Sequence, residues 1–386
     1  ATMVSGADAI HPGFGFLSEN ARFAELCEKC GITFVGPPSK VIRMLGNKKI
    51  ARSTMIAAGV PVVPGSEGDV EDIETGLKEA ERIGYPVIIK AALGGGGKGM
   101  RVANTPEEFP EAYATARKES EIAFGDGTMY IEHFVVNPRH IEFQILADSF
   151  GNVIHLGERD CSIQRNHQKM IEESPSAAVS PELREKMGHA AVTAAKAAGY
   201  VNAGTIEFLL EPDGKFWFME MNTRIQVEHP VTEWVTGIDL VKEQLKIASG
   251  MPLEIAQEDV RIQGHAIECR INAENPQKNF RPSPGTIQGA HFPGGNGIRV
   301  DTCVYNGCKI PPYYDSMLAK LIVHAGNRKE AIAKMQSALG EVIIDGIDTN
   351  IDYQYEILKD EDYQSGNFDT GFLASHIIAG VKINEN

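Results

Sequence analysis

Long strand-forming segments between positions 139 and 222 constrain the fold more strongly than any other feature. Four segments are rich in apolar and β-branched residues: RHIEFQILAD, NVIHLGERDCSI, GTIEFLLE and KFWFMEMN. One helix, opened by Ser180-Pro181, separates the first pair from the second. The pattern predicts an α+β fold built around a sheet.

The segments on either side differ in composition and predict a chain of several parts. The first part looks like an α/β fragment without the usual opening strand, so we expect the start of that domain to be missing. Thr105-Pro106-Glu107-Glu108 reads as a capping box and predicts a helix to about Phe124 inside a mobile flap. The predicted parts are a partial N-terminal α/β domain (1–38), a helical linker with one helix from Ser39 through Ala58 (39–61), an α+β lid (62–135), a strand-rich body (136–264) and a C-terminal subdomain (265–386).

Composition narrows the classes of partner. With 42% hydrophobic residues the chain can form a substantial core, and its net charge of −15 disfavours nucleic acid and anionic membranes as partners. No run of about 18 apolar residues predicts a membrane span, and the N-terminus lacks the regions of a signal peptide. Six scattered cysteines, with Cys27 and Cys30 on a predicted helix, indicate reduced thiols and a cytoplasmic location.

A glycine-rich stretch between two predicted strands is the first candidate ligand site. Gly94 to Gly97 are four consecutive glycines, flanked by Lys90 and Lys98. Glycine lets the backbone approach a ligand closely, and consecutive N–H groups can cradle phosphate oxygens. Because a strand follows the loop, it is neither a Walker A loop nor a Rossmann turn. The alternative is a flexible hairpin without a ligand.

A predicted β-hairpin, GTIEFLLE-PDGK-FWFMEMN, is the second candidate site. If residues 212–215 form the loop, Glu211 faces Phe216 and Glu207 faces Glu220. Like charges opposed across strands destabilise a sheet, whereas a divalent cation between them reverses the sign. Carboxylate oxygens suit Mg²⁺ or Mn²⁺. The alternative is a different register with one glutamate exposed.

Polar residues then alternate with apolar ones past the end of the hairpin. If the strand stays extended, Glu220, Asn222, Arg224, Gln226 and Glu228 share one face, where they can hold metal, fix an anion and supply a base. A solvated sheet face is the ordinary alternative. Three further polar features stand elsewhere in the chain. The run from Gln164 to Lys169 has an exposed loop as its ordinary explanation, and Asn137-Pro138-Arg139-His140 has a turn. Arg270 stands among apolar strand residues, where a structural ion pair is the ordinary explanation.

Together, these motifs resemble biotin carboxylase, the ATP-grasp component of biotin-dependent carboxylases. MEMNTRIQVEHPVTE and ERDCSIQRNHQK are highly specific, and the motifs keep the family's order over nearly the whole chain. The other matching pieces are AIHPGFGFLSEN, GNKK, YPVIIKAALGGGGKGMRV, NPRHIE, GTIEFL, HAIECRINAE, PSPG, PPYYDSM and IIDGIDTN. The resemblance implies an ATP-grasp fold with nucleotide held between lid and body.

The resemblance also implies site residues, carried over position by position. It makes Lys169, Arg224, Glu228 and Arg270 the catalytic residues, with Glu228 as the base and Arg270 on the ureido oxygen of biotin. The implied ATP-binding residues are Lys48, Lys90, Gly96, Gly97, Glu132, His133, Phe134, Val135, His140, Gln164 and His167. The implied metal ligands are Glu207, Glu220 and Asn222, and the implied bicarbonate-binding residues are Lys169, Arg224, Gln226, Val227 and Glu228.

The implied reaction joins ATP and bicarbonate to carboxyphosphate, which then carboxylates biotin. The implied partners are a biotin carboxyl carrier protein, carboxyltransferase subunits and a second copy of the chain. No biotin-attachment motif follows the last predicted helix, so we expect either a stand-alone subunit with a separate carrier or a fragment whose carrier domain is missing. Acetyl-CoA carboxylase in fatty acid synthesis is the expected context, with pyruvate or propionyl-CoA carboxylase as alternatives. Another ATP-grasp ligase, or a nucleotide-binding regulatory protein without turnover, would share parts of the pattern.

Overall fold

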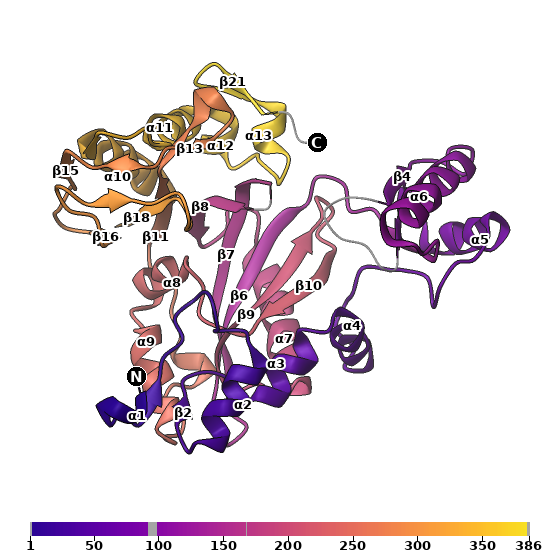
Figure 1. Cartoon of the computed structure of the whole chain (residues 1–386), viewed down its shortest axis with the longest axis horizontal. Coiled ribbons are helices and arrows are strands. Elements are labelled where there is room, and N and C mark those ends of the chain that lie inside the picture. The colour runs from indigo at the N-terminus through magenta and orange to yellow at the C-terminus, as the bar shows by residue number, and fades with distance from the viewer. Residues whose placement is uncertain (1, 92–98, 167, 384–386) are drawn as a thin grey trace. The chain divides into compact units, whose positions relative to one another are not determined.

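The computed structural model describes residues 2–91, 99–166 and 168–383 (Figure 1). They form two compact units, one made of Ala1–Val60 and Asn137–Asn386 and the other of Pro61–Val136. No helix in these described ranges is long and apolar enough to cross a bilayer.

The larger unit is built on an eight-stranded sheet in the order β10-β9-β6-β7-β8-β11-β18-β16. Every neighbouring pair in it is antiparallel. Its strands are β6 (Arg139–Ala147), β7 (Val153–Arg165), β8 (Gln168–Ser174), β9 (Asn202–Leu210), β10 (Phe216–Asn222), β11 (His265–Asn272), β16 (Ile298–Thr302) and β18 (Met317–Ala325). The four strand segments predicted between 139 and 222 are therefore confirmed as neighbours in one sheet.

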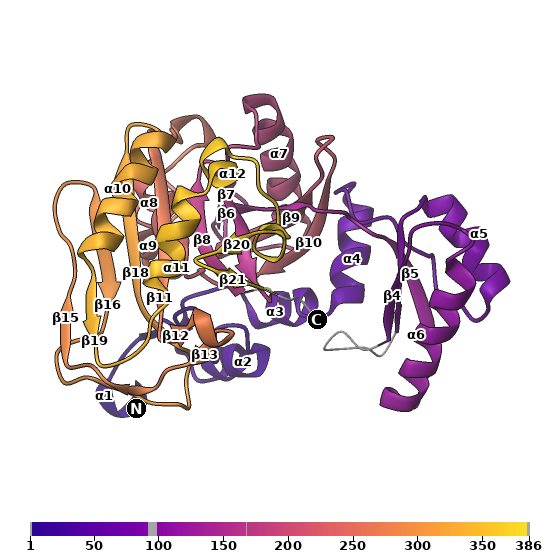
Figure 2. The same ribbon diagram turned by 90° about the horizontal axis from the view of Figure 1, so that it is seen from above.

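Helices cover this sheet because each carries an apolar face. In α7 (Pro181–Ala197), the alanine-rich face packs on β6 and β7, and Ser180 caps the first turn by accepting from the Leu183 N–H. On the C-terminal strands, α10 (Arg328–Glu341) packs against β11 and β18 (Figure 2). Met335 and Leu339 of α10 join Cys269 and Leu321 in one buried apolar cluster.

Shorter elements complete the larger unit. The helices are α8 (His229–Thr236), α9 (Leu240–Ala248), α11 (Ile351–Lys359), α12 (Glu361–Ser365) and α13 (Phe372–Ser375), with 3-10 turns at Gln257–Asp259 and Pro276–Lys278. The short strand pairs are β12 (Glu274–Asn275) with β13 (Arg281–Pro282), β14 (Gly285–Thr286) with β17 (Lys309–Ile310), β15 (Gly289–His291) with β19 (Ile343–Asp345), and β20 (Ile377–Ile378) with β21 (Val381–Lys382).

The N-terminal segment belongs to the larger unit and departs from the prediction in one place. It contains α1 (Thr2–Ser5), β1 (Ala9–Ile10), α2 (Ala21–Lys29), β2 (Thr33–Phe34), α3 (Ser39–Leu45) and α4 (Lys48–Ala57), and β1 and β2 are parallel. The single helix predicted from Ser39 through Ala58 is wrong. Gly46 ends α3, and the side chain of Asn47 accepts from the Ile50 N–H and starts a new helix.

The smaller unit is a three-stranded antiparallel sheet in the order β4-β3-β5, packed on two helices. Its elements are α5 (Ile73–Ile83), β3 (Val87–Ala91), β4 (Met100–Ala103), α6 (Phe109–Phe124) and β5 (Met129–His133). The predicted capping box is wrong, because residues 106–108 form a turn before α6. Glu108 instead accepts from the backbone and side-chain amides of Asn104.

Candidate functional site

A row of four charged residues crosses the sheet in direct register. Arg159 on β7 pairs with Glu142 on β6, Glu142 with Glu207 on β9, and Glu207 with Glu220 on β10. We call these four residues the charged row. The first three are buried, whereas Glu220 on the edge strand is exposed. Three adjacent carboxylates need nearby cations or a metal, because like charges opposed across strands repel.

The facing of Glu207 and Glu220 is confirmed, but the hairpin reaches it differently from the prediction. The loop has five residues, because Leu210 rather than Glu211 pairs with Phe216. A bulge at Met219 inserts one residue into β10 and restores the pairing of the two glutamates. The prediction that Glu211 faces Phe216 is therefore wrong, since a bulge cannot be counted from loop length.

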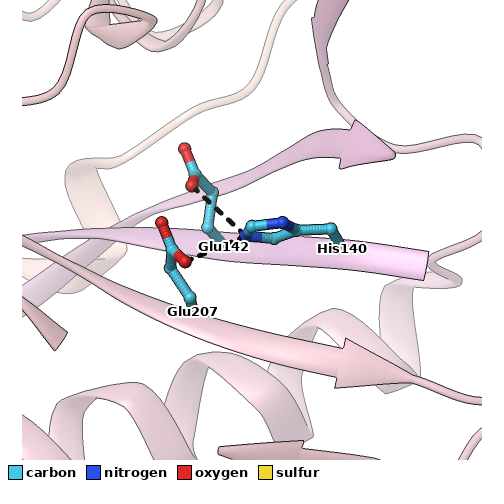
Figure 3. Close-up of side chains that lie close together, drawn as sticks. All are labelled: His140, Glu142 and Glu207. Carbon is cyan, nitrogen blue, oxygen red and sulfur yellow. Dashed lines mark ion pairs between the residues drawn. The ribbon is translucent and has the colours of Figure 1, made fainter. Parts of the chain in front are cut away.

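Glu207 is the most densely contacted carboxylate of the charged row. Its Oε1 accepts from Lys169 Nζ at 2.9 Å, from Asn222 Nδ2 at 2.9 Å and from Gln226 Nε2 at 2.8 Å. The ring of His140 lies beside Glu207 and Glu142 (Figure 3). Its Nε2 is 3.1 Å from a Glu207 oxygen and 3.9 Å from a Glu142 oxygen. Burial acts to raise the pKa of Glu207, but Lys169 and His140 outweigh it and hold the pKa far below its usual value.

The pKa of Glu220 is shifted upward, in the opposite direction from that of Glu207. The residue as a whole is exposed, but its carboxyl group is partly buried. This burial raises the pKa, and repulsion from Glu207 raises it further. Lys48, the first residue of α4, opposes this shift. A carboxylate whose neighbour is another carboxylate is suited to share a hard cation such as Mg²⁺.

The polar residues after Glu220 do not continue the strand, so the predicted extended face is wrong. The strand β10 ends at Asn222, and Glu228 is the N-cap residue of α8. Asn222, Gln226 and Glu228 still converge on the charged row, because the chain turns back toward it. The amides of Asn222 and Gln226 both donate to Glu207.

Lys169 on β8 joins three carboxylates. Its Nζ lies 2.6 Å from Glu142, 2.9 Å from Glu207 and 2.7 Å from Glu228. Burial would lower the pKa of Lys169, but Glu142 and Glu228 outweigh it and raise the pKa well above its usual value. The ammonium is thus a fixed positive charge, able to hold an anion at this point.

Glu228 and Arg270 form the other end of the cluster. Arg270 on β11 donates from Nη2 to Glu228 at 2.8 Å and from Nε to Glu172 at 2.6 Å. Burial acts to raise the pKa of Glu228, but Lys169, Arg270 and Arg159 hold it well below its usual value. Glu228 is therefore a carboxylate at neutral pH, with oxygens available as proton acceptors.

Arg224 points toward the N-terminal segment. Its Nε donates to Glu19 at 3.0 Å and its Nη2 to the Asn222 side-chain oxygen at 3.1 Å. Glu19 also accepts from the backbone and hydroxyl of Thr223. Glu19 was not predicted as a site residue, because its partner lies about two hundred positions away in the sequence.

The remaining predicted residues divide between the two units. In the larger unit, Gln164 pairs in register with Lys169, and the carbonyl of Val227 accepts from Lys320 Nζ at 2.9 Å. In the smaller unit, Lys90 Nζ lies 2.6 Å from Glu132, and the implied ATP-binding segment 132–135 begins within β5. Gly96, Gly97, Lys98 and His167 lie outside the described residues.

Three further residues of the cluster were missed by the sequence prediction. Glu142, Arg159 and Glu172 are completely buried charged residues within strands. The available signal was a charged residue inside an apolar strand segment, at HIEFQ, GERDC and MIEES. Buried charges of this kind are rare unless they are paired.

Comparisons with known proteins agree on one family. Sequence models match residues 1–42 (biotin carboxylase, N-terminal domain), 47–256 (carbamoyl-phosphate synthase L chain, ATP binding domain) and 268–375 (biotin carboxylase C-terminal domain). Biotin carboxylase 1 of Bacillus subtilis is 57% identical over 98% of this chain and 84% of its own length. A pyruvate carboxylase subunit of Methanothermobacter thermautotrophicus is 54% identical, over 96% of this chain and 75% of its own.

Solved structures give the same result. The biotin carboxylase domain of a thermophilic 2-oxoglutarate carboxylase, bound to ADP, is 52% identical and superposes with a TM-score of 0.90, covering 96% of this chain and 82% of that one. The biotin carboxylase subunit of pyruvate carboxylase is 53% identical, with a TM-score of 0.88 and the same coverage. The chain therefore belongs to the biotin carboxylase family of ATP-grasp ligases.

Proposed function

We propose that this chain uses ATP and bicarbonate to carboxylate biotin held on a carrier protein. The observation that carries the proposal is the convergence of Lys169, Glu228 and Arg270. One buried carboxylate lies 2.7 Å from a fixed ammonium and 2.8 Å from a guanidinium. Two cations and a base at one point match the needs of a reaction in which an anion must be held and deprotonated.

The nucleotide and metal roles rest on the charged row and on the relatives. A domain from Hydrogenobacter thermophilus has been solved with MgADP, ADP and bicarbonate. Glu207 and Glu220, with Asn222 beside them, offer the oxygen ligands that Mg²⁺ or Mn²⁺ prefers. A metal there would offset the negative charge of the nucleotide phosphates. We propose that Lys48, Lys90, His140, Gln164, His167, Gly96, Gly97 and 132–135 bind ATP.

The first step is the attack of bicarbonate on the γ-phosphate. We propose that Lys169, Arg224, Gln226 and Val227 hold bicarbonate while Glu228 takes the proton of its hydroxyl group. Bicarbonate would compete with Glu228 for Lys169, and losing that contact raises the basicity of Glu228. ADP leaves as carboxyphosphate forms, and the chain's contribution is to position the reactants and offset negative charge.

The second step transfers the carboxyl group to N1 of biotin. Carboxyphosphate breaks down to CO₂ and phosphate, and we propose that the phosphate takes the proton of N1 before N1 attacks CO₂. Loss of that proton places negative charge on the ureido oxygen, and we propose that Arg270 donates hydrogen bonds to it. Arg270 is held for this by Glu172 on one side and Glu228 on the other.

The proposed partners follow from the reaction and from the relatives. A biotin carboxyl carrier protein must present the biotin, and carboxyltransferase subunits must consume the carboxybiotin. A dimer is known for the Hydrogenobacter domain, and we propose a homodimer here. Acetyl-CoA carboxylase in fatty acid synthesis is the proposed context, although related chains belong to pyruvate and 2-oxoglutarate carboxylases. The cytoplasmic location stays a prediction.

The test measures ATP hydrolysis by the purified chain with and without bicarbonate and biotin. We expect slow hydrolysis that requires bicarbonate, increased by biotin, with labelled bicarbonate recovered in carboxybiotin. Equal rates with and without bicarbonate would exclude the proposed reaction. Nucleotide binding without any turnover would favour a regulatory nucleotide-binding protein instead.

A further inference from the structure

Arg159 is the only cation of the charged row, and the proposed reaction gives it no role. It is completely buried on β7 and lies among five acceptors. Its Nε donates to Glu142 at 2.5 Å, and its two terminal nitrogens donate to Gln144, Thr232, Thr205 and Gln226 at 2.8, 2.9, 3.2 and 2.9 Å. A guanidinium has five N–H donors, so each of them has an acceptor.

These contacts fix the orientation of one proposed bicarbonate ligand. The side-chain oxygen of Gln226 accepts from Arg159, so its NH₂ group must face the other way, where it donates to Glu207 at 2.8 Å. Without Arg159, a flipped amide would present its oxygen to the Glu207 carboxylate, which is repulsive. Arg159 and Glu207 therefore fix the orientation of the Gln226 amide together, one from each side.

The same guanidinium also anchors the chain around the proposed base. Glu228 is the N-cap residue of α8, and Arg159 bonds Gln226 just before it and Thr232 inside the helix. Both flanks of Glu228 are thereby tied to β7. Arg159 also bonds Glu142, which accepts from Lys169.

We infer that Arg159 is a positioning residue for bicarbonate activation, acting through Gln226 and the α8 N-terminus rather than by touching substrate. The inference rests on the proposed function. A displacement of about 1 Å in a reacting group can reduce a rate about a hundredfold. A residue that positions the reacting groups can therefore affect the rate without touching the substrate.

The test compares Arg159→Lys with a matched control, Arg184→Lys. Lysine keeps the charge but loses the planar fork. Arg184 on α7 likewise bonds a buried strand carboxylate, in its case through two nitrogens. That carboxylate is Glu158, the residue before Arg159 on β7. We expect Arg159→Lys to raise the KM for bicarbonate about tenfold or more with the KM for ATP nearly unchanged, whereas Arg184→Lys lowers the melting temperature without this split.

Two further variants cover the case in which Arg159→Lys fails to fold. Thr232→Val removes one acceptor of Arg159 with little change of shape, and Thr232→Ser retains the hydroxyl. We expect the bicarbonate KM to be raised in Thr232→Val and to return toward the wild-type value in Thr232→Ser. Combining Arg159→Lys with Gln226→Ala should cost less than the sum of the two single changes, because the two variants share the loss of the Arg159–Gln226 contact.

The outcomes separate the inference from the proposed function. Wild-type protein without bicarbonate-dependent turnover would overturn the proposed function itself. If the wild-type protein is active, three results would each overturn the inference alone. Arg159→Lys and Arg184→Lys could change the kinetics alike, or the KM values for bicarbonate and ATP could rise together in Arg159→Lys. The third result is an unchanged bicarbonate KM in Thr232→Val.

Discussion

Glu268 on β11 lies directly opposite Glu172 on β8, and both side chains are completely buried. One oxygen of Glu172 accepts from Arg270, but its other oxygen and both oxygens of Glu268 have no hydrogen-bond partner among the described residues. Burial raises the pKa of Glu268 well above its usual value; Lys320 opposes the shift, and Glu172 adds to it. The pair can therefore keep a proton at neutral pH.

The first prediction concerns Glu268→Gln, which copies the shape of the protonated acid. Because the folded pKa of Glu268 is raised, its contribution to stability is present below the unfolded pKa and is lost as pH rises toward the folded pKa. Above about pH 4.5, the free energy of unfolding of the variant should rise relative to that of wild type, by up to about 1.4 kcal/mol per pH unit. Denaturant unfolding of both proteins at several pH values measures this difference.

Glu173→Gln is the matched control for that experiment. Glu173 is equally buried, but contacts with His265 and Arg328 outweigh burial and lower its pKa. Its carboxylate therefore stabilises the fold above the unfolded pKa, and the control variant should be less stable than wild type at neutral pH. Equal pH profiles for both variants would contradict the assignment of a proton to Glu268.

The second prediction concerns Glu220→Gln and the metal. An uncompensated pair of carboxylates about 5 Å apart would repel by roughly 3 kcal/mol at an effective dielectric near 20. The structure lowers this expectation, because Lys169 and His140 already compensate Glu207 and because Glu220 is exposed. Without metal the variant should be as stable as wild type or slightly more so, and with Mg²⁺–ADP wild type should gain more.

Paired thermal melts of the two proteins, with and without Mg²⁺–ADP, measure both halves of that prediction. A variant that is clearly less stable without metal and gains as much as wild type with it would make Glu220 a structural residue. Its proposed role as a metal ligand would then be wrong.

The third prediction concerns Arg270→Lys. Lysine keeps one positive charge between Glu172 and Glu228 but cannot bond both in the same way. Biotin carboxylation should fall by about a hundredfold, the typical effect of losing a transition-state donor. Isothermal titration should show ADP affinity close to wild type, since Arg270 makes no proposed contact with nucleotide. Parallel losses of ADP affinity and carboxylation would show that Arg270 has been misassigned.

The fourth prediction tests the packing of α7 on the sheet. A Cβ added at Gly188 would collide with the ring of His155, which is itself packed edge-on against Phe143. Gly188→Ala should therefore destabilise the fold by about 1–3 kcal/mol, despite the better helix propensity of alanine. Gly340→Ala on the exposed side of α10 meets nothing and should stabilise by about 0.5 kcal/mol. Chemical denaturation of both variants gives the comparison.

Local patterns in the sequence determined the strands and the facing of Glu207 and Glu220. The segments around Glu207 and Glu220 are neighbours in sequence, so strand alternation and a short loop were enough to place them opposite each other. The count failed at Glu211, which lies in the loop, and at Met219, where a bulge compensates for the longer loop. The order of the motifs along the chain was likewise sufficient to identify the family, because that order does not depend on how the segments pack.

Contacts between distant segments were decided only by the tertiary structure. The charged row exists because β6 lies between β7 and β9, and no local pattern sets that order or its register. Glu19 meets Arg224 across 205 positions, and Glu268 meets Glu172 across two strands far apart in the chain. Charge pairing and burial depend on which strands become neighbours, so the sequence supplied the charged residues and the sheet order determined their partners.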